Sequence, residues 1–167
     1  DEYDHKLRDL MGMDNKMIRR LYDMARQNPK RVVFSETNHL NMLKAAETAR
    51  AEGICHPVLL GNEEKITNVA RENQISLEGI EIINLRHDRE EERRTRYAQL
   101  LTEKRNRQGM TFGEASEKMF ERNYFGMMMV ETGEADAMIT GVFSKYADTT
   151  AIAKEVIGIR EGLNHIG

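Results

Sequence analysis

The stretch RVVFSETNHLNMLKAAETARAEGICHPVLLG, residues 31–61, decides the fold. It begins with a short β-branched run at residues 31–35 and closes with a second apolar run at residues 56–60. Between them, residues 38–52 space their apolar side chains as one face of a helix does, with Asn38 as the expected N-cap. A strand, a helix and a second strand in this order predict two parallel strands joined by a crossover helix.

The rest of the chain repeats this alternation. Helices are expected at residues 63–73, 89–107, 111–122, 124–132 and 148–156, and strands at residues 80–85 and 136–140. Thr111 and Glu114 have the spacing of a capping box. The alternation predicts an α/β fold, a three-layer α/β/α arrangement around a mostly parallel sheet. Ligands bind beyond the carboxyl ends of such strands, which selects the loops 35–38, 61–64 and 141–150.

Composition excludes several classes of protein. The 167 residues contain 25 Lys and Arg against 28 Asp and Glu, and a net charge of -3 disfavours a nucleic-acid binder. No apolar run approaches the roughly 18 residues of a membrane span, and Cys55 has no cysteine partner. We therefore expect a soluble, cytoplasmic protein without contacts to nucleic acid or membrane. The chain starts without methionine and stops in a glycine-containing stretch, so we expect a segment of a longer protein.

Familiar catalytic motifs are missing from the sequence. It contains no G-x-G-x-x-G after a strand, no P-loop, no H-E-x-x-H and no G-x-S-x-G. A dinucleotide fold of the usual form and a P-loop NTPase are thereby disfavoured. The five histidines are scattered without an i, i+4 pair, so we predict no metal site.

The most informative candidate site is GEADAMITGVFSKYADTT, residues 133–150. A strand leads to Gly141, where the backbone can approach a ligand closely. Polar side chains then follow at or near a helix start, namely Ser144, Lys145, Tyr146, Thr149 and Thr150. Free amides and hydroxyls at a helix N-terminus favour phosphate or carboxylate. The alternative is that Asp148 only caps the helix and Gly141 only makes a turn.

Three further features keep two interpretations each. Arg105 and Arg107 could form a phosphate-facing pair, or lie solvated at a helix end, where the dipole favours them. Residues 127–129, three methionines, fit a helix or subunit contact better than a cofactor site. Glu36, directly after the first strand, either orients a ligand or caps the next helix.

Three separated blocks carry a family resemblance. SETNHLNMLKAAETARAEGICHPVLLGNEEKI (35–66), RNRQGMTFGEASE (105–117) and YFGMMMVETGEADAMITG (124–141) resemble, in order, the N-terminal part of the phosphate acetyl/butyryl transferase family. The resemblance implies the N-terminal half of a two-domain α/β/α module. Its active cleft would lie between the domains and transfer an acyl group between coenzyme A and phosphate, without a metal or a covalent enzyme intermediate.

The resemblance also assigns residues. Arg105 matches the family's arginine ahead of its Gly-Met-Thr turn, and Gly141 and Asp148 match positions of its Ser-Gly and Ala-Asp-Thr loop. After that loop the transferases have an arginine and a proline, and the arginine helps to hold the phosphate. This chain has Ala151 and Ile152 there. A missing guanidinium leaves the anion undercompensated and predicts poor turnover.

A second likeness points to a hybrid enzyme. GIREGLNHIG (158–167) resembles the transferase-like C-terminal region of large bacterial NADP-dependent malic enzymes, and residues 1–30 resemble the helical connector that follows their dehydrogenase domain. Residues 31–167 would then be the phosphotransacetylase-like domain, incomplete at its C-terminus. In such hybrids this region serves oligomer assembly and acetyl-CoA sensing. Arg160 is a candidate replacement for the lost arginine.

Three hypotheses follow for function. The first is an acetyl-CoA-sensing and oligomerisation region of an NADP-dependent malic enzyme, which decarboxylates malate oxidatively to pyruvate. The alternatives are an active phosphate acetyltransferase and a purely structural oligomerisation module using the methionine-rich helix. No catalytic residue is predicted; the predicted acyl-CoA or phosphate site consists of Arg105, Gly141, Ser144, Tyr146, Asp148, Thr149 and Arg160. Expected partners are acetyl-CoA, phosphate or acetyl phosphate, and further copies of the chain. No cofactor is expected in this segment, and NADP and a divalent metal only in the missing malic enzyme domain.

Overall fold

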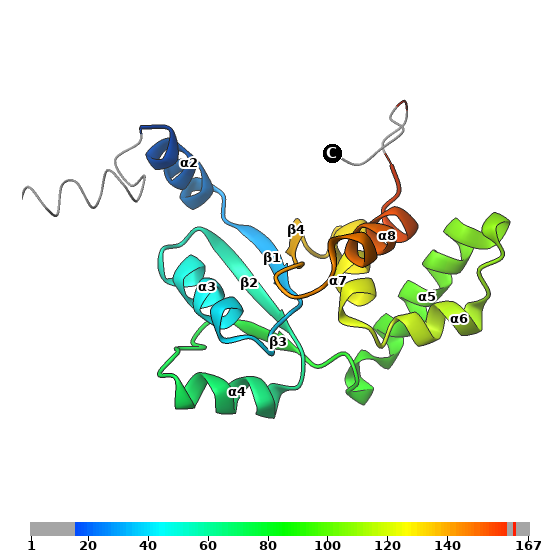
Figure 1. Ribbon diagram of the computed structural model, residues 1–167, viewed down its shortest axis with the longest axis horizontal. Coiled ribbons are helices and arrows are strands. Elements are labelled where there is room, and N and C mark those ends of the chain that lie inside the picture. The colour runs from blue at the N-terminus through cyan, green and yellow to red at the C-terminus, as the bar shows by residue number, and fades with distance from the viewer. Residues whose placement is uncertain (1–15, 160–161, 163–167) are drawn as a thin grey trace, which may run out of the picture.

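The computed structural model describes residues 16–159 and residue 162. Its helices are α2 (Lys16–Gln27), α3 (Leu40–Ala51), α4 (Glu63–Glu72), α5 (Glu91–Arg105), α6 (Phe112–Lys118), α7 (Arg122–Glu131) and α8 (Tyr146–Val156), with 3-10 turns η1 (Asp88–Glu90) and η2 (Asn106–Gln108). Its strands are β1 (Lys30–Phe34), β2 (Cys55–Leu60), β3 (Glu81–Ile83) and β4 (Ala137–Ile139). The predicted alternation of strands and helices is confirmed (Figure 1).

The four strands form one parallel sheet in the order β3-β2-β1-β4. The register sets Val33 of β1 opposite Val58 of β2 and Met138 of β4. Leu60 of β2 lies opposite Ile83 of β3. The chain thus returns to the other edge of β1 only after three helices and two turns beyond β3, so the ends of β1 and β4 become neighbours.

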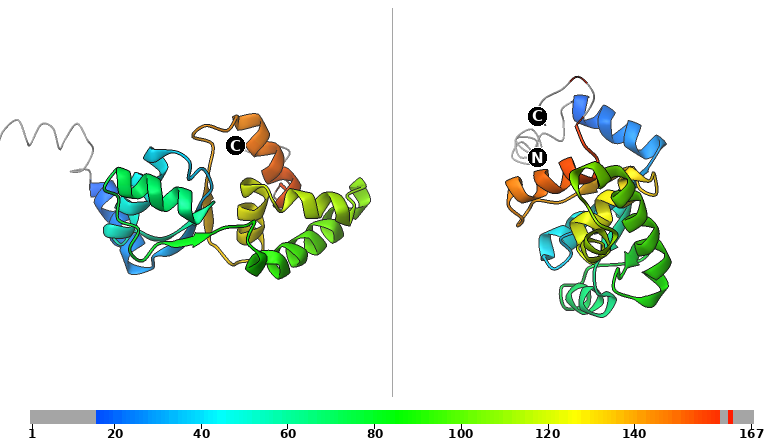
Figure 2. Two further views of the ribbon diagram at one scale, coloured as in Figure 1. Left: turned by 90° about the horizontal axis from the view of Figure 1, so that it is seen from below. Right: turned by 90° about the vertical axis from the view of Figure 1, so that its right-hand side faces the viewer.

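Alternating side chains along the strands enter two separate cores. Val33, Val58 and Leu60 pack with α5, α6, α7 and α8, while Phe34 and Leu59 pack with α3 and α4. Figure 2 shows the two groups of helices on opposite sides of the sheet. A strand with both faces buried requires apolar residues at successive positions, which explains the continuous runs VVF and VLL. The three-layer α/β/α prediction is confirmed.

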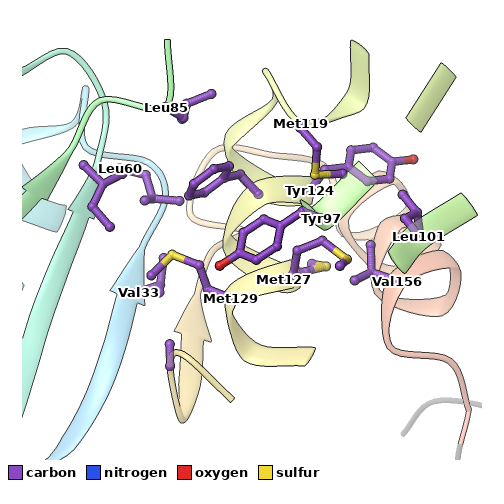
Figure 3. Close-up of a cluster of buried hydrophobic side chains, with 14 of the residues drawn as sticks. Val33, Leu60, Leu85, Tyr97, Leu101, Met119, Tyr124, Met127, Met129 and Val156 are labelled. Carbon is purple, nitrogen blue, oxygen red and sulfur yellow. The ribbon is translucent and has the colours of Figure 1, made fainter. Parts of the chain in front are cut away.

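The larger core contains the methionine cluster of α7 (Figure 3). Met127, Met128 and Met129 are 5%, 2% and 0% exposed, and Tyr97 and Phe125 meet edge to face with ring centroids 5.2 Å apart. These methionines already fill the interior of this chain. The expected helix contact is confirmed, because the three side chains pack inside this chain; since they are buried, they offer no outer surface for a subunit contact.

Two helix starts differ from expectation. α3 begins at Leu40 with His39 as its N-cap, not with Asn38, and no side chain caps it. α8 begins at Tyr146, with Lys145 as N-cap and Asp148 inside its first turn, so Asp148 does not cap the helix. The capping box of Thr111 and Glu114 is confirmed: each of the two residues accepts a hydrogen bond from the other's backbone N–H.

The expected connector, residues 1–30, is described only from residue 16 onward. Arg26 of helix α2 donates a hydrogen bond of 2.8 Å from Nε to the carbonyl oxygen of Glu52, the C-cap residue of α3. Leu21 and Met24 on this helix are 53% and 58% exposed. In the described part of the chain, no helix is both long and apolar enough to cross a bilayer.

Candidate functional site

The carboxyl ends of the parallel strands meet at one edge of the sheet. A cleft of about 670 Å³ lies there, and all three loops expected from the sequence contribute to it through Glu36, Asn62 and Ser144. The segment after β3 and the start of α7 complete its wall with Arg86 and Arg122. We call it the strand-end cleft. Its position is the one at which open parallel sheets bind ligands.

Glu36 connects the two central loops of this cleft. Its carboxylate accepts hydrogen bonds from the backbone N–H groups of Val142 (2.8 Å), Phe143 (3.2 Å) and Ser144 (2.8 Å), and from the Ser144 hydroxyl. Successive N–H groups converging on one point form an anion-binding nest. In this loop the nest holds the protein's own carboxylate, so Glu36 neither caps α3 nor stands free to orient a ligand.

Electrostatics agree with this role of Glu36. Burial raises the pKa of the carboxyl, which is 9% exposed, but the hydrogen bonds from Ser144, Phe143 and Val142 together outweigh burial and lower the pKa below its ordinary value. The imidazole of His39 also stacks on the ring of Phe143, with centroids 3.2 Å apart. The start of the 141–150 loop is therefore held by the loop after β1.

Arg122, the first residue of α7, stands beside this junction. Its Nη1 donates to the carbonyl oxygen of Ser35 at 3.1 Å and to the hydroxyl oxygen of Thr37 at 3.4 Å. Burial lowers the pKa of the Arg122 guanidinium, the negative charge of Glu36 raises it, and the positive charge of Arg86 lowers it again. Sequence analysis missed Arg86 and Arg122; the signal for Arg86 was its place directly after a strand of the parallel sheet.

Arg105 lies elsewhere, in a second cleft of about 580 Å³ that shares no lining residue with the first. We call it the α8 cleft, because Ala151 and Lys154 of that helix line it. Arg105 Nε donates to the carbonyl oxygen of Glu155 at 2.5 Å, and Nη2 to that of Lys154 at 2.8 Å. The guanidinium thus satisfies the unpaired carbonyls at the end of α8.

A half-buried polar cluster borders the α8 cleft. The Lys118 ammonium donates to the hydroxyl oxygen of Tyr124 at 2.8 Å and lies 3.4 Å from the Glu155 carboxylate, to which the Tyr124 hydroxyl also donates. Burial and the carboxylate of Glu155 raise the pKa of Tyr124. One residue each from α6, α7 and α8 takes part, so the cluster fastens these three helices together.

The structure separates the predicted site residues. Ser144 lines the strand-end cleft and Arg105 the α8 cleft, while Gly141, Tyr146, Asp148 and Thr149 line neither. Gly141 has a φ of +90°, which favours glycine, and the Thr149 hydroxyl is buried without a hydrogen-bond partner in the described part of the chain. Arg160 lies outside the described residues. Whether these residues bind an acyl-CoA or phosphate stays a prediction.

A metal site was not expected from the sequence. Within residues 16–159 and 162, no three His, Cys, Asp or Glu side chains gather closely enough to hold a metal ion. Each of the two clefts is instead lined by three Lys or Arg residues and by two Glu residues. Each cleft therefore has a small excess of cationic side chains.

Comparisons with known proteins agree with the fold described above. The EutD phosphotransacetylase from Staphylococcus aureus superposes with a TM-score of 0.75 and 27% identity, over 87% of this chain and 43% of that chain. The phosphate acetyltransferase of Acetivibrio thermocellus is 33% identical over 145 residues, 87% of this chain and 42% of that protein. The NADP-dependent malic enzyme of Salmonella typhimurium is 30% identical over 173 aligned positions, 100% of this chain and 22% of that protein.

The chain thus spans less than half the length of these relatives. The family described as phosphate acetyl/butaryl transferase matches residues 16–167, which include all the described elements. This chain belongs to the phosphate acetyl/butaryl transferase family.

Proposed function

We propose that this chain is the first half of a transferase-like module that binds acetyl-CoA and serves sensing and assembly in an NADP-dependent malic enzyme. Acetyl-CoA or a related acyl-CoA is the proposed ligand, with phosphate or acetyl phosphate as the smaller anion. NADP and a divalent metal would belong to a malate-oxidising domain outside this sequence. The cytoplasmic location stays a prediction.

One observation carries the proposal: the α8 cleft lacks the free guanidinium groups that phosphate transfer would use. Ala151, exposed on this cleft, stands where the family resemblance expects an arginine. Arg105, the other arginine assigned by resemblance, uses two of its donors on carbonyls of α8. A site for a transferred phosphoryl group needs fixed positive charge, so this arrangement supports binding over turnover.

The extent of the relatives supports the malic enzyme interpretation. The alignment with the malic enzyme of Salmonella typhimurium includes the whole chain, whereas that with the transferase of Acetivibrio thermocellus includes 87%. The malic enzyme alignment therefore includes residues 1–30, the expected connector. Assembly would use surfaces other than residues 127–129, which are buried.

The test uses the full-length protein that contains this chain. Calorimetric titration should show saturable acetyl-CoA binding. The rate of malate oxidation should change when acetyl-CoA is added. In a transferase assay with acetyl phosphate and coenzyme A, the protein should consume no thiol above background. Ala151→Arg restores the family's arginine, and Ala147→Arg, one turn earlier on the same exposed face, is its matched control. Absence of acetyl-CoA binding, together with malate oxidation that ignores acetyl-CoA, would overturn the proposal.

A second candidate is an active phosphate acetyltransferase. It is supported by the 33% identity to the transferase of Acetivibrio thermocellus and by the retained segment at residues 133–141. Thiol consumption by the unmodified full-length protein, lost on replacement of Arg105, would decide for it. An absence of thiol consumption at any protein concentration would remove it.

A further inference from the structure

The strand-end cleft holds three cations from three separate segments. Lys65 comes from the first turn of α4, Arg86 from the segment after β3, and Arg122 from the start of α7. None of the three makes an ion pair with a described residue. Side chains from distant parts of the sequence are thus gathered at one edge of the sheet with their charge uncompensated by a direct partner.

The acidic residues of the cleft offset this charge only in part, because the negative charge of Glu36 acts on Arg122 without forming an ion pair with it. The carboxylate of Glu36 is engaged by three backbone N–H groups and the Ser144 hydroxyl. Glu121 is exposed at the rim and is the N-cap of α7, but its side chain makes no capping hydrogen bond. The first backbone N–H groups of α7 therefore remain without a side-chain cap, and the positive end of the helix dipole adds to the cationic side chains.

Ser35 provides the independent sign of a ligand. The residue lines the cleft and is only 1% exposed, yet its hydroxyl has no hydrogen-bond partner among the described residues. The backbone of the same residue is fully used: its N–H donates to the carbonyl oxygen of Ile139 at 3.3 Å, and its carbonyl accepts from Arg122. A buried hydroxyl left unpaired costs free energy, which a bound acceptor would recover.

Both guanidinium groups also keep free donors. Toward the described residues Arg122 donates only through Nη1, although a guanidinium has five N–H groups. The Arg86 guanidinium contacts the ring of Phe120, 5.8 Å from its centroid, without a described carboxylate partner. Planar guanidinium groups with unused edges match the oxygens of phosphate.

From this placement we propose that the strand-end cleft is a second anion site, which binds a phosphate group through Ser35, Arg86 and Arg122. The group would belong either to a free phosphate or diphosphate, or to the diphosphate of a coenzyme A. The site is separate from the α8 cleft with Arg105, so it does not depend on the proposed sensing function. Lys65, which also lines the cleft, would add charge without a fixed geometry.

Calorimetric titration of the full-length protein with inorganic pyrophosphate, at low and moderate salt, tests the site. Ser35→Ala and Arg86→Gln should each weaken binding by about tenfold. Neither side chain has a polar protein partner to lose, so both variants should keep the melting temperature of the parent. Arg71→Gln makes the same change of charge on an exposed residue at the far end of α4 and should leave binding unchanged.

Coenzyme A, added to the pyrophosphate-loaded protein, distinguishes the two sources. If coenzyme A displaces the pyrophosphate, and Ser35→Ala weakens this displacement, the site binds the diphosphate of the coenzyme. If coenzyme A does not displace the pyrophosphate, the site binds a free anion. Pyrophosphate that fails to saturate, or that is weakened equally by Arg71→Gln and Arg86→Gln, overturns the proposal as unspecific attraction. Acetyl-CoA regulation could fail while pyrophosphate binding persists, so the two proposals fail separately.

Discussion

Replacing Glu36 by glutamine is the sharpest test of how the candidate site is held. The substitution keeps the size of the side chain but turns one acceptor oxygen into an NH₂ group. That group would face backbone N–H donors of Val142 or Ser144, which lie 2.8 Å from the carboxylate oxygens. At least one charge-assisted hydrogen bond is lost and a buried donor is left unpaired. We expect Glu36→Gln to lower the free energy of unfolding by about 3 kcal/mol.

The assay compares urea unfolding with limited proteolysis of residues 141–146. Glu36→Gln should speed cleavage in this loop more than it shifts the global transition, because the lost contacts are those of the loop. Glu121→Gln is the matched control: it makes the same chemical change at the same cleft, on an exposed side chain without a capping bond. Its effect should stay within about 0.5 kcal/mol. Equal effects of the two substitutions would refute the role of Glu36.

The stability difference between the parent and Glu36→Gln should also depend on pH. The pKa of Glu36 is lowered in the folded state. The contribution of its carboxylate to the free energy of unfolding is therefore complete above the unfolded-state pKa and is lost as the pH falls through the folded-state pKa. The difference should be constant between about pH 6 and 8 and shrink below about pH 4. A difference that grows toward acid pH would contradict the assignment of an ionised carboxylate.

Two further substitutions test the packing and the α8 cleft. Gly126→Ala places a Cβ 2.8 Å from a methionine sulfur and 3.1 Å from a leucine methyl. In urea unfolding it should lower the free energy of unfolding by about 1–3 kcal/mol. Gly113→Ala, whose Cβ would lie in open space on α6, is the control and should not lower it. Arg105→Ala should lower the melting temperature through the lost bonds to the carbonyls of α8, while Arg107→Ala, at an exposed position, should leave it unchanged. If Arg105→Ala abolished acetyl-CoA binding with an unchanged melting temperature, its role would be ligand binding instead.

The sequence predicted local structure well because local structure depends on nearby residues. The strands at 31–35 and 56–60 follow from successive apolar side chains, and the capping box at Thr111 follows from a spacing of three residues. The order of the strands is not local. Placing β4 beside β1, on the opposite side from β2, requires packing of the intervening helices, which no pattern in residues 61–136 specifies.

The candidate site was harder to predict for the same reason. Glu36 was noticed, but its partners lie 106 to 108 residues away, and they become neighbours only because β1 and β4 pair. Arg105 meets carbonyl groups 49 and 50 residues away, which no pattern near residue 105 indicates. Arg122 was expected at the end of a helix over residues 111–122, whereas it is the first residue of α7. Side chains that act through long-range contacts thus carry little signal in a single sequence.

The two clefts share one segment, residues 142–156, and both of its ends are fixed by side chains from other elements. Glu36 holds the start of the segment, and Arg105 and Lys118 hold its end. Between these contacts Ala151 is exposed and has no polar side-chain group to hold. A guanidinium restored at residue 151 would therefore disturb neither end. Any transferase activity gained by Ala151→Arg, but not by Ala147→Arg, would then report the missing charge alone, since the positions of the two clefts would be unchanged.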